Sequence, residues 1–389
     1  MFSNVRWVLL LSVISALWLM VGRVFAQPAS GYEVWAADQN GNIVYVLDAD
    51  GKVLRMIDGT TLGDAKRPHM LWGVSKDEFI YSANTASNSV TVLSNKDGTV
   101  RAVIPGVGKA PHAAQPNPKQ PERIYISNIA PQAAGPDGKA DRGETISEVV
   151  RSNGKWEVTR FLDLKTAPPL ADTARFPSRR PVCVGFSKDG RYLLATLFNG
   201  GLIVVDLPAW NVVNAWGKDE IAENGCGFAA SPSGDEIYVT AGNLQSSWLY
   251  VFDVTAAPKL VASHNLSKFG QDSHGLAVDA ASQTLWVVHR VSSNATVHSL
   301  TDIRKPDHQI SVIDFVGKTP DLIVISPDQR RAYVTLRGPT PAPTIPHATV
   351  GETPGVSIID VPSRKLSKVV HLGDKAADFH GIFIPAAQR

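Results

Sequence analysis

Short runs of alternating apolar and polar residues recur along the chain, and turn-forming residues separate them. In one stretch, four such runs follow in succession at residues 227–230, 236–241, 248–253 and 259–264. A Ser-Pro-Ser-Gly sequence separates the first run from the second. Alternation over a few residues predicts β-strands, and four strands joined by short turns predict an antiparallel meander.

This four-strand pattern occurs seven times, and each copy has an aromatic or apolar anchor in one strand. The anchors are Trp35, Tyr81, Tyr125, Leu194, Tyr238, Trp286 and Tyr333. Their spacings of 46, 44, 69, 44, 48 and 47 residues are typical of propeller blades. We therefore predict an all-β fold, a seven-bladed β-propeller of four-stranded antiparallel blades.

The two ends of the pattern complement each other. The first copy begins at residues 33–37 with a segment that matches the second strand of the other copies. Residues 379–384 match the first strands elsewhere, such as 273–278. We predict that the C-terminal strand joins blade one and closes the ring.

Two of the copies share a Tyr-Val-Thr sequence, at residues 238–240 and 333–335, each after a Ser-Pro turn. These segments resemble YVTN-type repeats, from which YncE-like periplasmic propeller proteins are built. The resemblance covers nearly all of the chain after residue 26. It implies the propeller fold, and it names no activity, because function belongs to sites rather than folds.

The first 26 residues do not follow the strand pattern. An arginine precedes the apolar stretch 7–21, and Val24-Phe25-Ala26 places small residues before Gln27. This arrangement predicts a signal peptide, residues 1–26, and a propeller domain, residues 27–389, in the periplasm or outside the cell. The stretch is shorter than the roughly 20 residues of a membrane span. We expect no stable span after cleavage, although an uncleaved anchor stays open.

The charge of the chain limits the classes of partner it can bind, and its cysteines indicate whether a disulfide can form. The net charge of +2 and the absence of a basic run exclude a nucleic-acid partner of the usual electrostatic kind. The chain has two cysteines, Cys183 and Cys226, and export permits a disulfide between them. We expect a disulfide or two buried thiols rather than metal ligation.

Three polar insertions, at residues 131–144, 163–180 and 338–354, interrupt blades three and seven. In a four-stranded meander, the connection between strands two and three lies on the same face as the connection between blades. All three insertions should therefore lie on the face where the first strands begin. Long loops in a compact domain are often functional, so we expect a monomer whose loop-rich face binds a protein partner or a small-molecule ligand.

Ligand-type side chains occur at matching positions near the start of the first strands. The aligned residues are His112, Val182, Cys226, His274, Asp321 and His380, with His69 expected one residue out of register. First strands line the channel of a propeller, so these side chains should circle one of its mouths. His289 and Arg337, at the ends of second strands, should approach the same rim. The candidate ligand-binding residues are thus His69, His112, His274, His289, Asp321, Arg337 and His380.

Imidazole nitrogens suit zinc, copper, iron and nickel. His380, His69 and His112 belong to neighbouring first strands, so they form the candidate metal site, for a divalent ion such as Cu or Zn. Two alternatives stay open. The histidines could bind only backbone or channel water, with Gly275 and Gly381 permitting close approach of strands, or they could serve acid–base chemistry on a small molecule.

Three functions follow from these alternatives. The favoured one is an exported binding or scaffold propeller that uses its loop-rich, His-lined face and is not an enzyme. The second is a redox metal site, by analogy with the propellers of nitrous oxide reductase and haem nitrite reductases. The third is a lactonase-like hydrolase, since some propeller lactonases resemble this repeat family. The chain has no Cys-x-x-Cys-His, which excludes covalent c-type haem attachment by that motif.

Overall fold

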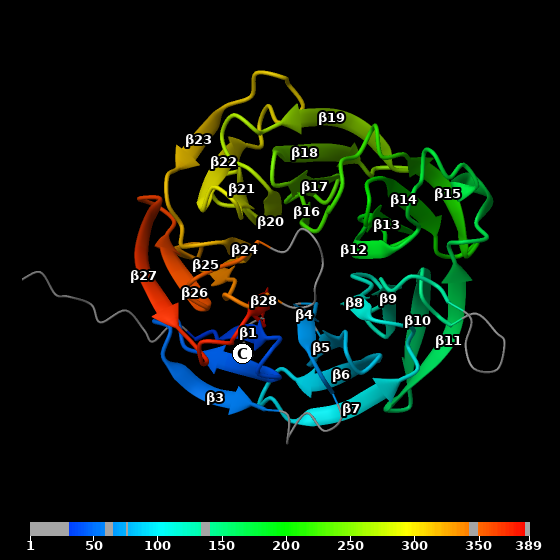
Figure 1. Cartoon of the computed structure of the whole chain (residues 1–389), viewed down its shortest axis with the longest axis horizontal. Coiled ribbons are helices and arrows are strands. Elements are labelled where there is room, and N and C mark those ends of the chain that lie inside the picture. The colour runs from blue at the N-terminus through cyan, green and yellow to red at the C-terminus, as the bar shows by residue number, and fades with distance from the viewer. Residues whose placement is uncertain (1–30, 59–64, 75–76, 134–140, 342–348, 386–389) are drawn as a thin grey trace, which may run out of the picture. The chain divides into compact units, whose positions relative to one another are not determined.

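All strands in the described part of the chain belong to seven four-stranded antiparallel sheets, which confirms the predicted propeller (Figure 1). The computed structural model describes residues 31–385, except 59–64, 75–76, 134–140 and 342–348. The predicted signal peptide, residues 1–26, lies outside the described residues. The strands of each blade are given below from the innermost to the outermost.

Blade one contains β28 (Phe379–Phe383), β1 (Val34–Asp38), β2 (Ile43–Leu47) and β3 (Val53–Ile57). Blade two contains β4 (Pro68–Trp72), β5 (Phe79–Asn84), β6 (Ser89–Ser94) and β7 (Val100–Pro105). Blade three contains β8 (Pro111–Pro116), β9 (Arg123–Asn128), β10 (Thr145–Ser152) and β11 (Lys155–Asp163). Blade four contains β12 (Pro181–Phe186), β13 (Tyr192–Leu197), β14 (Leu202–Asp206) and β15 (Asn211–Trp216).

Blade five contains β16 (Phe228–Ala230), β17 (Glu236–Asn243), β18 (Ser246–Asp253) and β19 (Lys259–Asn265). Blade six contains β20 (Ser273–Asp279), β21 (Thr284–His289), β22 (Asn294–Ser299) and β23 (Ile310–Ile313). Blade seven contains β24 (Pro320–Ile325), β25 (Arg331–Leu336), β26 (Gly355–Asp360) and β27 (Lys365–His371). A short 3-10 helix, η1 (Pro168–Leu170), precedes blade four.

The C-terminal strand closes the ring as predicted. Strand β28 pairs with β1 in antiparallel register, with Phe383 opposite Trp35. Figure 1 shows β28 on the inner side of β1, next to the inner strands of blades two and seven. Within the described residues, no helix is both long enough and apolar enough to cross a membrane.

The anchors hold the blades against one another. Trp35, Tyr81, Tyr125, Tyr238, Trp286 and Tyr333 are all buried, because each second strand is covered by neighbouring blades on both faces. The outermost strands instead alternate between exposed and partly buried residues, as in β7 and β11. This contrast follows from the position of each strand, since only the outer edge of a blade meets solvent.

A β-bulge lies at the start of the inner strand in six of the seven sheets. The pairing of β4 with β5, for example, shifts register between Pro68 and Met70, and the pairing of β8 with β9 shifts between Pro111 and Ala113. The same shift occurs in blades one, four, six and seven. A bulge locally re-aims a side chain. Here it acts at the residues that were predicted to circle the channel.

Hydroxyl groups in the second strands hold these bulges in place. In blade seven, Thr335 Oγ1 accepts a hydrogen bond from the Leu322 N–H at the bulge (3.0 Å) and donates to the carbonyl of His380 in blade one (2.8 Å). In blade five, whose inner strand has no such register shift, Thr240 accepts from the Gly227 N–H and donates to the His274 carbonyl. The threonine of the Tyr-Val-Thr sequence therefore joins blade five to blade six and blade seven to blade one at the channel wall.

The described residues at the ends of the insertions lie on the predicted face. Asn128, after which the first insertion begins, pairs with Pro111 at the start of β8. Leu336, before the third insertion, pairs with Pro320 at the start of β24. The second insertion leads directly into Pro181 at the start of β12. All three thus adjoin the ends of inner strands that carry the candidate site.

Candidate metal centre at the channel mouth

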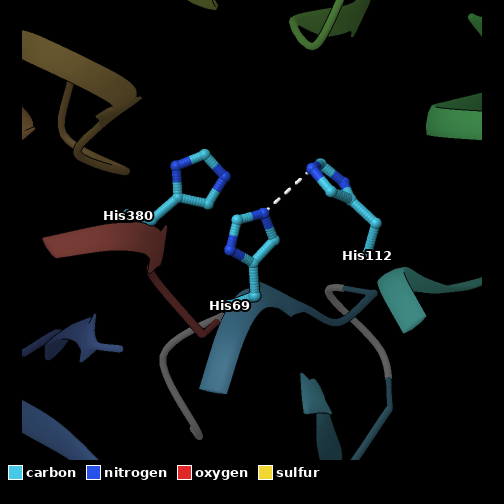
Figure 2. A group of neighbouring side chains, drawn as sticks. All are labelled: His69, His112 and His380. Carbon is cyan, nitrogen blue, oxygen red and sulfur yellow. Dashed lines mark hydrogen bonds between the residues drawn. The ribbon is translucent and has the colours of Figure 1, made fainter. Parts of the chain in front are cut away.

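Three consecutive inner strands bring three buried histidines together. His380 in β28, His69 in β4 and His112 in β8 each stand second in their strand. One ligand nitrogen from each lies within 4.8 Å of the others, and Figure 2 shows the three rings grouped around one point. They are the three residues predicted as metal ligands.

His69 stands in register with the other histidines, which corrects the expected one-residue offset. Pro68 pairs with Asn84 at the end of β5, just as Pro111 pairs with Asn128 at the end of β9. Register is set by this pairing with the second strand. Counting residues back from the second strand across the turn therefore misplaced His69 by one residue.

The spacing of the imidazoles suits coordination of one ion. The two Nε2 atoms of His69 and His112 are 2.9 Å apart, and the rings of His69 and His380 stack with centroids 4.0 Å apart. Two ligands of a tetrahedral ion with bonds of about 2.0–2.1 Å stand about 3.3 Å apart, slightly more than the separation of these two nitrogens. Two facing ring nitrogens at this distance share either a proton or a cation.

Hydrogen bonds at the far side of two rings set their tautomers. His380 Nδ1 lies 2.5 Å from Asp321 Oδ2, and His69 Nδ1 lies 2.5 Å from Gln39 Oε1. Because Gln39 Nε2 donates to Asp378, its Oε1 is the acceptor, so both histidines carry their proton on Nδ1. Their Nε2 lone pairs are then available as ligands. The Nε2 atom of His380 is buried and has no hydrogen-bond partner among the described residues.

Burial keeps two of the candidate ligands, His69 and His112, uncharged. Burial lowers the pKa of His69 well below its usual range, and the neighbouring His380, His112 and Arg337 lower it further. Burial, together with His380, lowers the pKa of His112 to about 3. A neutral imidazole is the form that binds a metal ion. Two of the three histidines therefore hold that form throughout the physiological pH range.

Asp321 lies at the centre of the polar layer behind the histidines. Its carboxylate contacts His380, His274 Nε2 (3.2 Å) and Arg337 Nη1 (2.9 Å). Burial alone would raise the pKa of Asp321, but His380, Arg337 and His274 hold it well below its usual range. The carboxylate is therefore ionised, and it can orient a ligand histidine as carboxylates do behind metal sites.

Further buried ion pairs extend this layer. Arg337 pairs with Asp378 through two nitrogens at 2.7 Å, and Arg290 pairs with Asp272 at 2.8 Å and reaches Asp321 at 3.5 Å. Three carboxylates thus face two guanidinium groups, which leaves one surplus negative charge. A surplus negative charge beside neutral imidazoles favours a bound cation.

Four members of this layer were not predicted from the sequence, namely Gln39, Asp272, Arg290 and Asp378. Gln39 and Arg290 occupy the same place as Arg337, directly after the second strand of a blade. This shared position, directly after a second strand, could have identified Gln39 and Arg290 from the sequence, as it did Arg337. His289, which was expected at the rim, is not brought to the cluster. Its ring nitrogens lie beside Ser247 and Thr296 instead.

Cys183 and Cys226 form a disulfide between blades four and five, with Cα atoms 5.0 Å apart. One of the two expected arrangements is thus present. The glycines that follow His274 and His380 permit close approach of neighbouring inner strands, as one alternative predicted. A Cβ atom at Gly381 would stand 2.6 Å from the His69 carbonyl oxygen. Close approach of inner strands and convergence of histidines therefore occur together.

The channel below the histidines is apolar. A cavity of 280 Å³ adjoins the polar layer and is lined by Cys226, Leu276, Ile323, Ile382 and Phe228, among others. A second cavity of 180 Å³ shares Trp72 and Phe228 with it. The residues that line these two cavities are mostly apolar, and the three histidines are not among them.

Comparison with known proteins supports the fold. A periplasmic gluconolactonase of Pseudomonas aeruginosa, PpgL, superposes with a TM-score of 0.64 at 14% identity, covering 92% of this chain and 99% of that one. Kuenenia stuttgartiensis hydrazine synthase gives 0.60 at 17% identity, covering 89% and 94%. The dihydro-heme d1 dehydrogenase NirN gives 0.57 at 15% identity, covering 93% and 76%.

These likenesses place the chain in the class of seven-bladed β-propellers. At such low identity they show the fold alone. No protein-family model matches the chain, and no curated protein matches its sequence. The resemblance to YVTN-type repeats therefore stays a prediction.

Proposed function

We propose that this protein is an exported propeller that holds one divalent transition-metal ion, copper or zinc, in His69, His112 and His380, and uses it to bind a small ligand. The observation that carries the proposal is the convergence of three buried imidazoles from three consecutive inner strands. Two of them have their ligand lone pair fixed by Asp321 or Gln39. Such outer partners are typical of metal-binding histidines.

The donor set also indicates what the ion would do. Three protein ligands leave a fourth position of a tetrahedral ion open, whereas purely structural zinc sites are closed by four. An open position accepts a donor atom of a ligand, and the adjoining cavity of 280 Å³ accepts an apolar body. We therefore propose a small molecule with an anionic or nitrogen donor and an apolar part. The loop-rich face stays a candidate for a protein partner.

Hydrolysis of a lactone is the second candidate function. Three histidines around an open position form the donor set that lowers the pKa of zinc-bound water to about 7. The name of the Pseudomonas aeruginosa propeller makes lactones a reasonable first substrate class. Turnover of lactones by the zinc-loaded protein, lost in His69→Ala, would favour this activity over ligand binding alone.

Metal content tests the proposal directly. The purified protein would be exposed to copper or zinc, desalted and analysed for metal, beside a His69→Ala, His380→Ala variant. We expect about one ion per chain in the wild type and a loss of most of it in the variant. A His264→Ala, His308→Ala variant removes two histidines outside the site and should retain the ion.

Two results would overturn the proposal. One is a wild-type protein that retains no metal after desalting. The other is retention of the ion by the His69→Ala, His380→Ala variant when circular dichroism shows the same β-sheet content as the wild type.

A further inference from the structure

The disulfide lies among groups that bind metals. Cys183 Sγ is 3.7 Å from His112 Nδ1, and His112, Cys183 and Cys226 have their ligand atoms within 4.8 Å of one another. On its other side, Cys226 forms an equally close group with His274 and His380. All five residues are at most 4% exposed. Two sulfurs thus lie between imidazoles on both sides.

We propose that reduction of the Cys183–Cys226 disulfide creates a second, thiolate-containing metal site, with His112 on one side and His274 or His380 on the other. Two thiolates and two imidazoles are a donor set that suits Zn(II) in tetrahedral geometry, and thiolates select Cu(I). This inference goes beyond the proposed function, because the oxidised protein has no free thiol among these residues.

The framework keeps the sulfurs in place after the bond opens. Cys183 lies in β12, and Cys226 lies just before β16, where Thr196 and Thr240 hold the neighbouring Gly225 carbonyl and Gly227 N–H. These contacts do not depend on the disulfide. The two thiols would therefore remain near His112 and His274 instead of moving apart.

A dithiol reductant supplies two electrons and two protons, the S–S bond breaks, two thiols form, and the reductant becomes a disulfide. Binding of a divalent ion then releases one proton from each thiol. Cys226 lines the 280 Å³ cavity, so a small reductant has space beside this sulfur.

The two sites share His112 and His380, so they compete for ligands. In the oxidised protein the ion would bind to His69, His112 and His380. In the reduced protein the softer donors of Cys183 and Cys226 would draw a thiophilic ion toward blades four and five. The redox state of one disulfide would thus select which metal the channel mouth holds.

Cobalt(II) is the probe for the experiment, because its bonds to thiolate give a near-ultraviolet charge-transfer absorption that its bonds to imidazole lack. The intact protein would be reduced with a water-soluble phosphine, desalted without oxygen and titrated with cobalt. Thiols would be counted in a denatured aliquot to verify reduction. We expect the absorption in the reduced wild type, none in the oxidised protein, and none in a Cys183→Ser, Cys226→Ser variant.

Matched variants separate this inference from the proposed function. His69→Ala should lose metal when oxidised and keep the cobalt–thiolate absorption when reduced, whereas the Cys183→Ser, Cys226→Ser variant should lose the absorption and keep the ion of the first site. Metal binding by the oxidised wild type without the absorption on reduction would sink the second site and leave the first intact. If the reduced protein shows the absorption but the oxidised protein binds no metal, the second site would stand and the first would be refuted. A disulfide that stays unreduced in the folded protein would also refute the redox-dependent site.

Discussion

At the residue scale, Asp321 connects the candidate ligands to the rest of the fold. It is fully buried and contacts two histidines and two arginines at once. A buried carboxylate with these partners does two things. It compensates the positive charge of Arg290 and Arg337, and it holds the His380 proton on Nδ1 so that Nε2 faces the site.

Replacing Asp321 by Asn should therefore lower both the stability of the fold and the affinity for the metal ion. The loss of affinity should exceed that of a variant that loses a comparable buried ion pair away from the histidines. Loss of an outer-shell carboxylate typically weakens metal affinity by about 10–100-fold. Breaking a buried ion pair costs about 3–5 kcal/mol of unfolding free energy. Asp272→Asn provides the control, because Asp272 pairs with Arg290 and makes no hydrogen bond or ion pair with a histidine among the described residues. Competition titration of zinc and urea denaturation would test both variants, and equal loss of affinity in the two would contradict this role.

At the scale of the strand, the second strand of each blade supports the ring residues. Thr335 accepts from the N–H that the bulge frees in its own blade and donates to the carbonyl of the next. The strand sequence Tyr-Val-Thr thus combines a packing anchor with a hydroxyl at the channel wall. Its repetition reflects a repeated structural task, namely to join two blades, because Thr240 makes the corresponding contact in blade five.

Thr335→Val should lower both stability and metal affinity. The substitution keeps the shape of the side chain but leaves a buried N–H and a buried carbonyl without their partner, at a cost of about 1–3 kcal/mol. It also frees the backbone of His380, so zinc should bind more weakly. Thr91→Val, which removes a buried hydroxyl that accepts from Asn84 in blade two, should lower stability only. Unchanged zinc affinity in Thr335→Val would show that the hydroxyl does not position His380.

The elements were predictable from the sequence, whereas the side-chain directions were not. Period-two alternation and a recurring anchor gave seven blades, the closing strand and the three histidines that converge. The bulges have no sequence signature of their own, so a count across turns misplaced His69. Successive side chains at the end of a strand point in opposite directions, so a shift of one residue decides which of them faces the channel. His289 therefore points between blades five and six, and its successor Arg290 reaches Asp321.

At the scale of the whole molecule, the propeller also buries histidines outside the candidate metal site. His289 and His298 in blade six are fully buried and linked through Thr296. Burial lowers the pKa of His289 to about 3. Burial, with His308, His289 and His264 nearby, lowers the pKa of His298 well below its usual range. Both side chains are therefore neutral in the fold and bind protons when the chain unfolds.

The stability of the metal-free protein should therefore fall as pH drops below about 6.5. An unfolded histidine has a pKa of about 6.5, so between that value and the lower folded pKa the unfolded chain binds the extra proton. Each such histidine adds a slope of about 1.4 kcal/mol per pH unit to the unfolding free energy, and its contribution is fully present above that range. Urea denaturation between pH 7.5 and pH 5, with a chelator present, would measure this slope. A His289→Asn, His298→Asn variant should show a shallower slope. A wild-type stability that stays constant over this range would mean that the buried histidines gain protons without unfolding.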